Sequence, residues 1–290
     1  GTAYANVGSM KSWGEELSIS STNIKTQDFS WQTSLIYSHN RTEITDLYNQ
    51  GRVIDLVQGN GFAKQGYPAR ALFSIPFVGI NEKGNPVCIN EKGQATVGDL
   101  NFQERNNTDY LIYEGSTDPI YNGSLGNTFN YKGFHLNLFL TYAFGNVVRL
   151  DPVFKAKYND LTSMNHDFKN RWMQPGDENV TNVPGVVSRY EYEQNRTLLN
   201  TAYNAYNYTS VRTAKGDFIR LKEISLAYDF PHRWLEHSPV NNISLKLQAT
   251  NLMLLYADKK LNGQDPEFMN AGGVASPMPK QFTLTLKLGL

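Results

Sequence analysis

Residues Phe282–Leu290 read FTLTLKLGL, and their apolar and polar side chains alternate without a break. Phenylalanine and leucine occupy every even position, while threonine, lysine and glycine occupy the odd positions. Side chains that alternate with a period of two belong to a β-strand with one apolar face and one polar face. This stretch therefore predicts a strand whose two faces meet different surroundings.

The same alternation recurs in six other stretches, and each of them predicts a further strand. Large apolar and aromatic residues share one face, with Glu15 as an exception, and polar residues share the other. Ala71–Ile80 is a candidate eighth strand, weakened by Pro76 because proline cannot donate a hydrogen bond to a neighbouring strand. We therefore predict an all-β fold with seven or eight strands. The six stretches are residues 13–19, 29–39, 125–131, 134–144, 224–230 and 243–250.

The length of Phe134–Phe144 indicates what kind of sheet these strands form. Ten steps of about 3.4 Å span roughly 34 Å along a strand. Tilted by about 40°, that span covers roughly 26 Å, close to the ~25 Å apolar band of an outer-membrane β-barrel. Aromatic residues at both ends, including Tyr142, suit the girdles of such a barrel. We predict a transmembrane antiparallel β-barrel; the alternative is a β-sandwich, whose strands average about 5–6 residues.

The predicted connections alternate between short and long along the chain. Residues 20–28, 132–133 and 231–242 are short, residues 39–125 and 146–216 are long, and residues 251–280 are intermediate. Outer-membrane barrels combine short periplasmic turns with long extracellular loops in this way. We therefore expect the long connections to be extracellular loops.

One predicted strand, Phe218–Phe230, changes phase along its length. Ile219 and Leu221 are apolar at odd positions, whereas after Lys222 the apolar residues are at even positions. A β-bulge near Lys222–Glu223 would keep both halves on one face. Alternatively, Phe218–Lys222 lies above the membrane band, where alternation is not required.

Composition excludes several classes of protein. The 290 residues carry 27 basic and 27 acidic side chains, so no nucleic acid partner is indicated. Cys88 is the single cysteine, which rules out an internal disulfide. No run of 18 apolar residues predicts a transmembrane helix. The mean hydropathy of −0.47 is typical of soluble proteins, but barrels have polar lumens and loops.

The sequence has no recognisable signal peptide and begins at Gly1 rather than at methionine. We therefore expect a processed or deliberately cut chain.

The sequence carries no catalytic signature. The five histidines lack metal-binding spacing, and no nucleophile elbow, zinc-protease, phosphate-binding or dinucleotide-binding motif occurs. Asp265 and Glu267 are two carboxylates two residues apart, a pair that is common by chance. We predict that the protein is not an enzyme and uses no cofactor or metal.

The long segment Asn146–Gly216 combines aromatic residues with many asparagine, arginine and aspartate residues. Aromatic rings stack on sugars or peptides while amides donate and accept hydrogen bonds, so this composition suits nutrient binding. The competing interpretation is that the tyrosines pack the loop against itself. The candidate binding residues are Trp172, Tyr190, Tyr192, Tyr203, Tyr206 and Tyr208.

Several longer stretches match a known family in their order. They are NVGSMKSWGEELSIS (6–20), NIKTQDFSWQTSL (23–35), GNTFNYKGFHLNLFLTYAFGN (126–146), RWMQPGD (171–177), GDFIRLKEISLAYDFP (216–231), ISLKLQATNLMLLY (243–256), GQDPE (263–267) and PMPKQFTLTLKLGL (277–290). Together they resemble the C-terminal end of SusC/RagA-type TonB-dependent outer-membrane transporters. The resemblance spans nearly the whole chain. Departures include Ser12, where the family usually has asparagine, and the terminal Leu290, where barrels usually end in phenylalanine.

The resemblance implies import of oligosaccharides or peptides across the bacterial outer membrane. It implies energy from TonB, delivered through an N-terminal part, and a SusD-like surface lipoprotein over the barrel. Residues 1–290 would then be the C-terminal part of a barrel of about 22 strands, without the plug domain and the N-terminal strands. Outer-membrane lipid would surround the apolar face.

Two other classes of protein compete with the transporter. A secreted β-rich carbohydrate-binding module predicts polar residues on both sheet faces and short, even loops. A glycan-degrading enzyme needs a pair of catalytic carboxylates, and the sequence shows no convincing pair.

Overall fold

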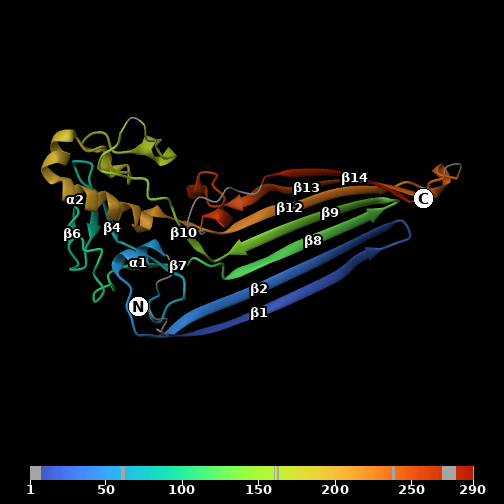
Figure 1. Cartoon of the computed structure of the whole chain (residues 1–290), viewed down its shortest axis with the longest axis horizontal. Helices are drawn as coiled ribbons and strands as arrows, with labels where there is room; N and C mark the ends of the chain where they lie inside the picture. The colour runs from blue at the N-terminus through green and yellow to red at the C-terminus, as the bar shows by residue number, and fades with distance from the viewer. Residues whose placement is uncertain are drawn as a thin grey trace, which may run out of the picture.

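Seven long strands form one antiparallel sheet in the computed structural model, which describes residues 8–59, 63–159, 161, 163–236, 239–269 and 279–289. Each strand pairs with its neighbours in chain order (Figure 1). All seven predicted strands are confirmed, although Leu290 lies outside the described residues. They are β1 (Gly8–Lys25), β2 (Phe29–Leu47), β8 (Tyr121–Tyr131), β9 (Phe134–Phe144), β12 (Phe218–Asp229), β13 (Asn242–Ala257) and β14 (Gln281–Gly289).

The phase change in β12 is a bulge. Against both β9 and β13, the pairing register shifts between Leu221 and Glu223. Leu221 is opposite Leu140 and Ile224 is opposite Leu138, so the apolar side chains stay on one face across the shift. The predicted bulge near Lys222–Glu223 is therefore confirmed.

Short and long connections lie at opposite ends of the sheet (Figure 1). At one end, Lys132 and Gly133 form a two-residue turn in which both residues have positive φ, 45° and 87°. A turn with two positive φ values matches the twist of the strands that it joins. At the same end, β12 and β13 are joined through the short turn η4 (His232–Trp234). The three longest connections all meet at the other end, as the alternation of lengths predicts.

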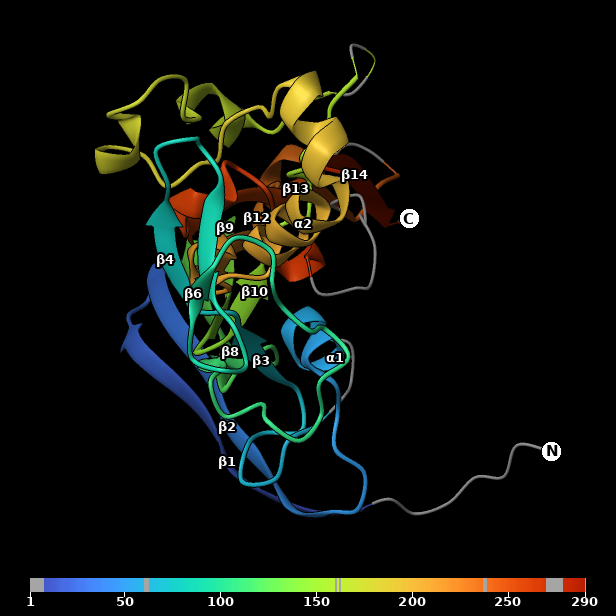
Figure 2. The same cartoon turned by 90° about the vertical axis from the view of Figure 1, so that its left-hand side faces the viewer.

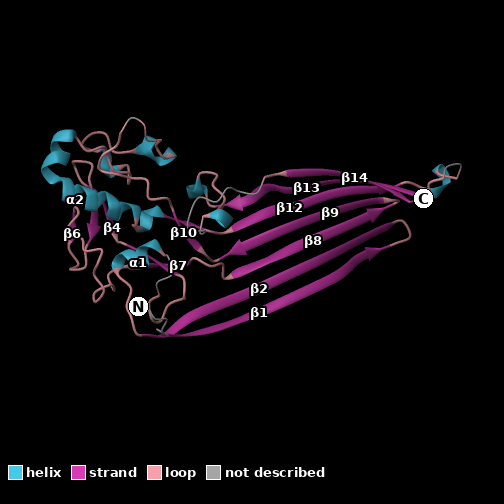
Figure 3. Cartoon of the chain, in the orientation of Figure 1, coloured by secondary structure: helices cyan, strands magenta, loops and turns pink. Residues whose placement is uncertain are grey.

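We call the structure built by these three long connections the cap; it comprises the described residues within 48–120, 145–217 and 258–269. Its helices and strands are short except for α2, as Figure 3 shows. They are α1 (Val53–Gln58), β3 (Ala71–Ser74), β4 (Phe77–Ile80), β5 (Pro86–Ile89), β6 (Ala95–Thr96), β7 (Ile112–Ser116), β10 (Val147–Arg149), η1 (His166–Asn170), η2 (Asp177–Asn179), α2 (Arg189–Asn207), η3 (Ser210–Arg212), β11 (Thr213–Lys215), η5 (Lys259–Leu261) and η6 (Pro266–Phe268).

One prediction about this region is wrong. Ala71–Ile80 is not an eighth strand of the large sheet: β3 pairs with β7 and β4 with β5, in two small sheets. Pro76 lies between β3 and β4, where it cannot continue a hydrogen-bonded strand. Asn146–Gly216 is a long connection as predicted, and it contains the 19-residue helix α2, which the sequence analysis did not predict.

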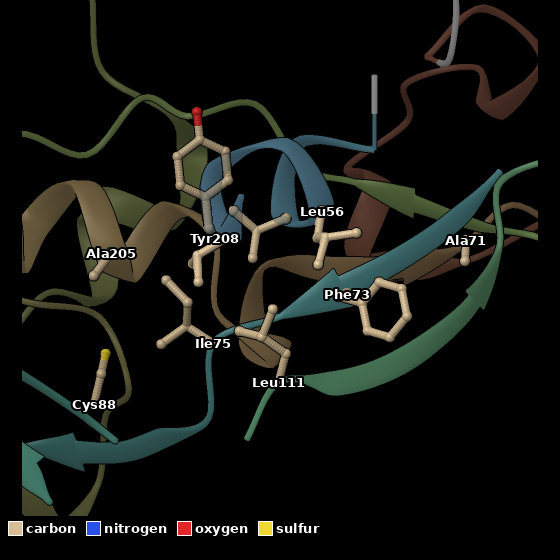
Figure 4. Close-up of a cluster of buried hydrophobic side chains, with 10 residues drawn as sticks. Leu56, Ala71, Phe73, Ile75, Cys88, Leu111, Ala205 and Tyr208 are labelled. Atoms are coloured by element: carbon tan, nitrogen blue, oxygen red, sulfur yellow. The ribbon is translucent and has the colours of Figure 1, made fainter. Parts of the chain in front are cut away.

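The packed hydrophobic core lies in the cap and not on the sheet. One cluster joins α1, β3 and the carboxyl end of α2, through Leu56, Phe73, Ile75 and Tyr208 among others (Figure 4). A second cluster, around Tyr203 and Leu199, holds α2 against residues 156 and 187. No helix among the described residues is long and apolar enough to cross a membrane. Figure 2 shows the cap in front of the curved sheet.

Candidate membrane face and outer cap

The register of the strands joins their apolar side chains into continuous rows. One row crosses all seven strands, because each member is directly opposite the next on the neighbouring strand. Directly opposite residues project from the same face of a sheet. The row consists of Ile24, Trp31, Phe129, Leu136, Leu226, Leu247 and Leu284.

This apolar face is not covered by any part of the described chain. Leu226 is 46% exposed, Leu247 55% and Leu284 69%. Soluble proteins rarely leave such a large continuous apolar surface in water. The face therefore requires an apolar environment.

Aromatic residues border the apolar face at both ends. At the short-turn end, Tyr131, Phe134 and Tyr228 are opposite one another on β8, β9 and β12. At the cap end, Tyr142 on β9 and Tyr256 on β13 flank Ile219 on the same face. Phe134 and Tyr142 are eight residues apart, or about 27 Å along the strand. Two aromatic girdles at this spacing are typical of a barrel wall in a membrane.

The opposite face of the sheet is polar. A hollow of about 290 Å³ lies on it near the β1–β2 turn. Nearby, His135 contacts the side-chain oxygens of Asn130 and Asp229 at 2.6 and 2.9 Å, and Asn130 donates to Ser30. This row of hydrogen bonds crosses β2, β8, β9 and β12. The hollow is lined by Ser20, Ser21, Thr22, Gln32, Thr33, Ser34, Gly126 and Thr128.

A buried arginine holds three segments of the cap together. The Arg149 guanidinium donates to the backbone oxygens of Thr209 (2.8 Å), Phe73 (2.6 Å) and Val57 (3.1 Å). Val57 lies in the last turn of α1, where a helix leaves backbone carbonyls without an intrahelical partner, and Thr209 precedes η3, where its oxygen also accepts from the backbone N–H of Arg212. Burial lowers the pKa of Arg149 to about 10, which still leaves it charged at neutral pH.

Two more buried arginines attach further segments. Arg212 donates to the Asp167 carboxylate (3.1 Å) and to the backbone oxygen of Asp151 (3.1 Å), which fixes Asp151 and Asp167 beside η3. Arg220, on the polar face of β12, forms ion pairs with Asp265 (2.5 Å) and Glu267 (3.1 Å). Asp265 and Glu267, which showed no catalytic pattern in the sequence, thus hold residues 258–269 onto the sheet.

The structure separates the six predicted binding residues into two groups. Tyr203, Tyr206 and Tyr208 are buried in the cap core, so their rings are not open to a nutrient. Burial raises the pKa of Tyr203 and Tyr206, because the charged phenolate would lose its water. For these three residues the packing interpretation of the sequence holds and the binding interpretation does not.

The other three predicted residues lie nearer the surface. Tyr190 is 79% exposed in the first turn of α2. The half-buried Tyr192 has the cations of Lys157 and Arg196 over its ring, at 5.6 and 5.7 Å from the centroid. The Trp172 indole N–H donates to the Glu178 carboxylate at 2.9 Å. None of these three residues lines either of the two cap cavities described next.

Two polar cavities do occur in the cap. One, of about 160 Å³, lies beside α1 and includes Lys64 and Asp109, which form an ion pair at 2.8 Å. The other, of about 340 Å³, lies between residues 163–167 and 260–264. Asn262 donates to Asp167 at 3.1 Å across this second cavity. Sequence reasoning missed these sites, because no local pattern marks residues that only the folded cap brings together.

The fold and the apolar face define a partial antiparallel barrel wall with an ordered cap at one end.

No family model matches the chain. The chain is 25% identical to TonB-dependent receptor P39 of Formosa agariphila, over 94% of the chain and 29% of that receptor. It is 27% identical to TonB-dependent receptor P26 of the same organism, over 98% and 29%.

A third relative is the TonB-dependent receptor SusC of Bacteroides thetaiotaomicron, 24% identical over 98% of the chain and 27% of SusC. Among solved structures, the RagAB peptide transporter matches with a TM-score of 0.70 and 23% identity, over 98% of the chain and 30% of that chain. The resemblance to SusC/RagA-type TonB-dependent receptors is thereby confirmed. The chain spans less than a third of the length of these relatives.

Proposed function

We propose that residues 1–290 form the C-terminal strands and outer loops of an importer in the bacterial outer membrane. The plug domain and the remaining strands would come from the rest of a longer protein. The observation that carries this proposal is the uncovered apolar face, bordered by two aromatic rows about 27 Å apart along β9. The polar face would line the lumen.

The sheet itself supports the proposal that other strands complete it. In the described residues, β1 and β14 each pair with one neighbour, so each leaves one edge open. An unpaired strand edge in hydrocarbon costs several kcal/mol for every unsatisfied backbone group. Further strands of a complete barrel would pair with both edges, and Phe282–Leu290 would close the barrel against its first strand.

The cargo we propose is an oligosaccharide or a peptide, taken up with a SusD-like surface lipoprotein and with energy from TonB. Similarity to SusC and to a structure described as a peptide transporter supports this choice. Transport requires no catalytic residues in this chain. Tyr190 is the candidate for nutrient contact whose ring is most open.

Uptake by cells tests this function. Full-length protein, expressed in its own bacterium, should be required for uptake of labelled peptides or labelled oligosaccharides. Uptake should stop when TonB is deleted. Equal uptake of both cargo classes with and without the protein would overturn the proposal.

A further inference from the structure

The dipeptide Asn–Gly occurs twice in the described chain, in two different backbone settings. Asn122–Gly123 lies in β8, and Asn262–Gly263 lies in the turn that follows η5. A third pair, Asn60–Gly61, lies outside the described residues. An asparagine before a glycine is prone to deamidation, because the glycine nitrogen can attack the side-chain amide carbon without hindrance from a Cβ atom. Both described asparagines are exposed, so the backbone around each pair determines which one reacts.

In β8 the pair is held by the sheet. The strand lies between β2 and β9, and Gly123 is opposite Tyr37 on one side and Tyr142 on the other. A strand that is paired on both sides uses its backbone N–H groups in the hydrogen-bond ladder. A Cβ atom at Gly123 would collide with the Ile36 carbonyl oxygen and the Tyr142 hydroxyl, so the backbone is also tightly packed. The Gly123 nitrogen therefore reaches the Asn122 side chain only after the sheet opens locally.

The turn at Asn262 lacks these restraints. Asn262 has φ of +51° and Gly263 has φ of +83°, both in the left-handed region. The Asn262 N–H donates to Lys259 and the Gln264 N–H donates to Leu261, but the Gly263 N–H has no acceptor among the described residues. Beyond the chain neighbours of Gly263, no atom lies within 4 Å of the position that its Cβ would take. The nitrogen that must attack is thus unbonded and has open space around it.

The side chain of Asn262 joins two segments of the cap. Its amide donates to one carboxylate oxygen of Asp167 at 3.1 Å, which ties residues 258–269 to η1. The other oxygen of Asp167 accepts from the buried Arg212 at 3.1 Å. Asn262 and Asp167 both line the cavity of about 340 Å³ between these segments. A carboxylate in place of the Asn262 amide would remove the donor and put a second negative charge beside Asp167.

We propose that Asn262 is a deamidation site, and that deamidation loosens residues 258–269 from Asp167. The Gly263 nitrogen attacks the side-chain carbon of Asn262 and forms a nitrogen–carbon bond. The side-chain nitrogen leaves as ammonia and takes the proton that the Gly263 nitrogen loses. Water then opens the cyclic imide and leaves aspartate or isoaspartate at position 262. The reaction needs no oxidant or reductant, and it does not depend on the proposed transport function.

Only one side of this segment would loosen. Arg220 holds the same segment onto β12 through its ion pairs with Asp265 and Glu267, and neither pair involves Asn262. The contact with residues 163–167 would therefore open while the segment stays attached to the sheet. The expected result is a wider cavity between residues 163–167 and 260–264.

The first test follows the modification in unmodified full-length protein. Folded protein is incubated at neutral and at mildly alkaline pH, digested in acid, and analysed by mass spectrometry that separates asparagine from aspartate and isoaspartate. The converted fraction at Asn262 should exceed that at Asn122 about tenfold or more, because a local opening that costs about 1.4 kcal/mol already slows the reaction tenfold. Conversion should be faster at alkaline pH, because the attacking nitrogen must lose its proton. No conversion at Asn262, or equal conversion at both positions, overturns the proposal.

The second test measures the effect of the modification on the cap. Amide hydrogen exchange in residues 258–269 should be about tenfold faster or more in Asn262→Asp, as loss of a hydrogen bond to a charged group predicts. Gln264→Glu is the matched control, because it adds the same charge to the same cavity and keeps the bond from Asn262 to Asp167. Heat-modifiable gel migration checks that each variant has assembled. Unchanged exchange in Asn262→Asp, or equal acceleration in the control, overturns the loosening.

Discussion

In the sheet, leucines such as Leu247 and Leu284 remain exposed, whereas in the cap the rings of Phe73 and Tyr203 are almost entirely buried. The sheet gains little from its own side chains over most of its length, because its apolar face is not covered by any part of the described chain. The cap has a dense core of its own. The difference indicates that the sheet depends on its surroundings for stability, while the cap depends on internal packing and on buried hydrogen bonds.

The substitution with the largest expected effect breaks the hydrogen-bond network inside the cap. Arg149→Met removes a donor from the carbonyls of Val57, Phe73 and Thr209, of which the Thr209 oxygen keeps the backbone N–H of Arg212. Unsatisfied buried groups cost about 1–3 kcal/mol each, so we expect a loss of about 2 kcal/mol or more in cap stability. Limited proteolysis of the assembled protein should show a much faster cut within the cap.

Arg196→Met is the control for this prediction. Arg196 is exposed, and its ion pair with Glu193 is long at 3.5 Å, so its loss should leave the cleavage rate nearly unchanged. Equal protease resistance of Arg149→Met and unmodified protein would show that the arginine is dispensable.

A second substitution tests the dependence of the sheet on an apolar environment. Leu247→Arg places a charge in the apolar row, and arginine at the middle of a bilayer costs about 2–4 kcal/mol on the lipid face of a barrel. The fraction of heat-modifiable, folded full-length protein should fall. Gln248→Arg, on the polar face of the same strand, should assemble normally; failure of both variants to the same extent would contradict the assignment of faces.

A smaller effect tests the helix that sequence reasoning missed. The Ser188 hydroxyl accepts a hydrogen bond from the backbone N–H of Glu191 at 3.2 Å and so caps α2. Ser188→Ala should cost about 1 kcal/mol of helix stability. Hydrogen exchange should speed up in the first turn of α2, and Ser163→Ala, on an exposed part of the cap, should not change it.

The smallest expected effect concerns pH and the short helix α1. Hydrogen bonds from the Arg52 side chain lower the pKa of Asp55. A carboxyl group with a lowered folded-state pKa contributes stability above its unfolded-state pKa of about 3.9, and the contribution is lost as pH falls further. Amide exchange in α1, corrected for intrinsic rates, should therefore increase below about pH 4. Arg52→Gln should weaken this pH dependence; an unchanged profile would argue against the ion pair.

The sheet could be predicted from the sequence because its pattern is local. Alternation along Phe134–Phe144 or Phe282–Gly289 is visible within eleven residues or fewer, and the bulge at Lys222 is visible as a change of phase. Each strand meets two different environments, so each residue position shows which face it occupies. Register then follows from matching apolar positions on neighbouring strands.

The cap could not be predicted in the same way. Its contacts join segments that are distant in the sequence, as in the hydrogen bond from Arg149 to the Val57 oxygen. No regular spacing of residues in the sequence indicates such contacts. One local signal was present: Ser188 followed by Glu191 is a capping-box pattern that marks the start of α2. The tyrosines of α2 look alike in the sequence, yet Tyr190 is exposed and Tyr203 is buried. The position of each tyrosine on the helix determines whether its side chain faces solvent or the core of the cap.

The bonds of Arg149 also have a consequence for the order in which the protein assembles. They join residues separated by 60, 76 and 92 positions along the chain. Such distant contacts form late, because the intervening chain must first be brought together. The strands between these segments supply that proximity. A protease-resistant cap therefore indicates that the strands between these segments have paired in register.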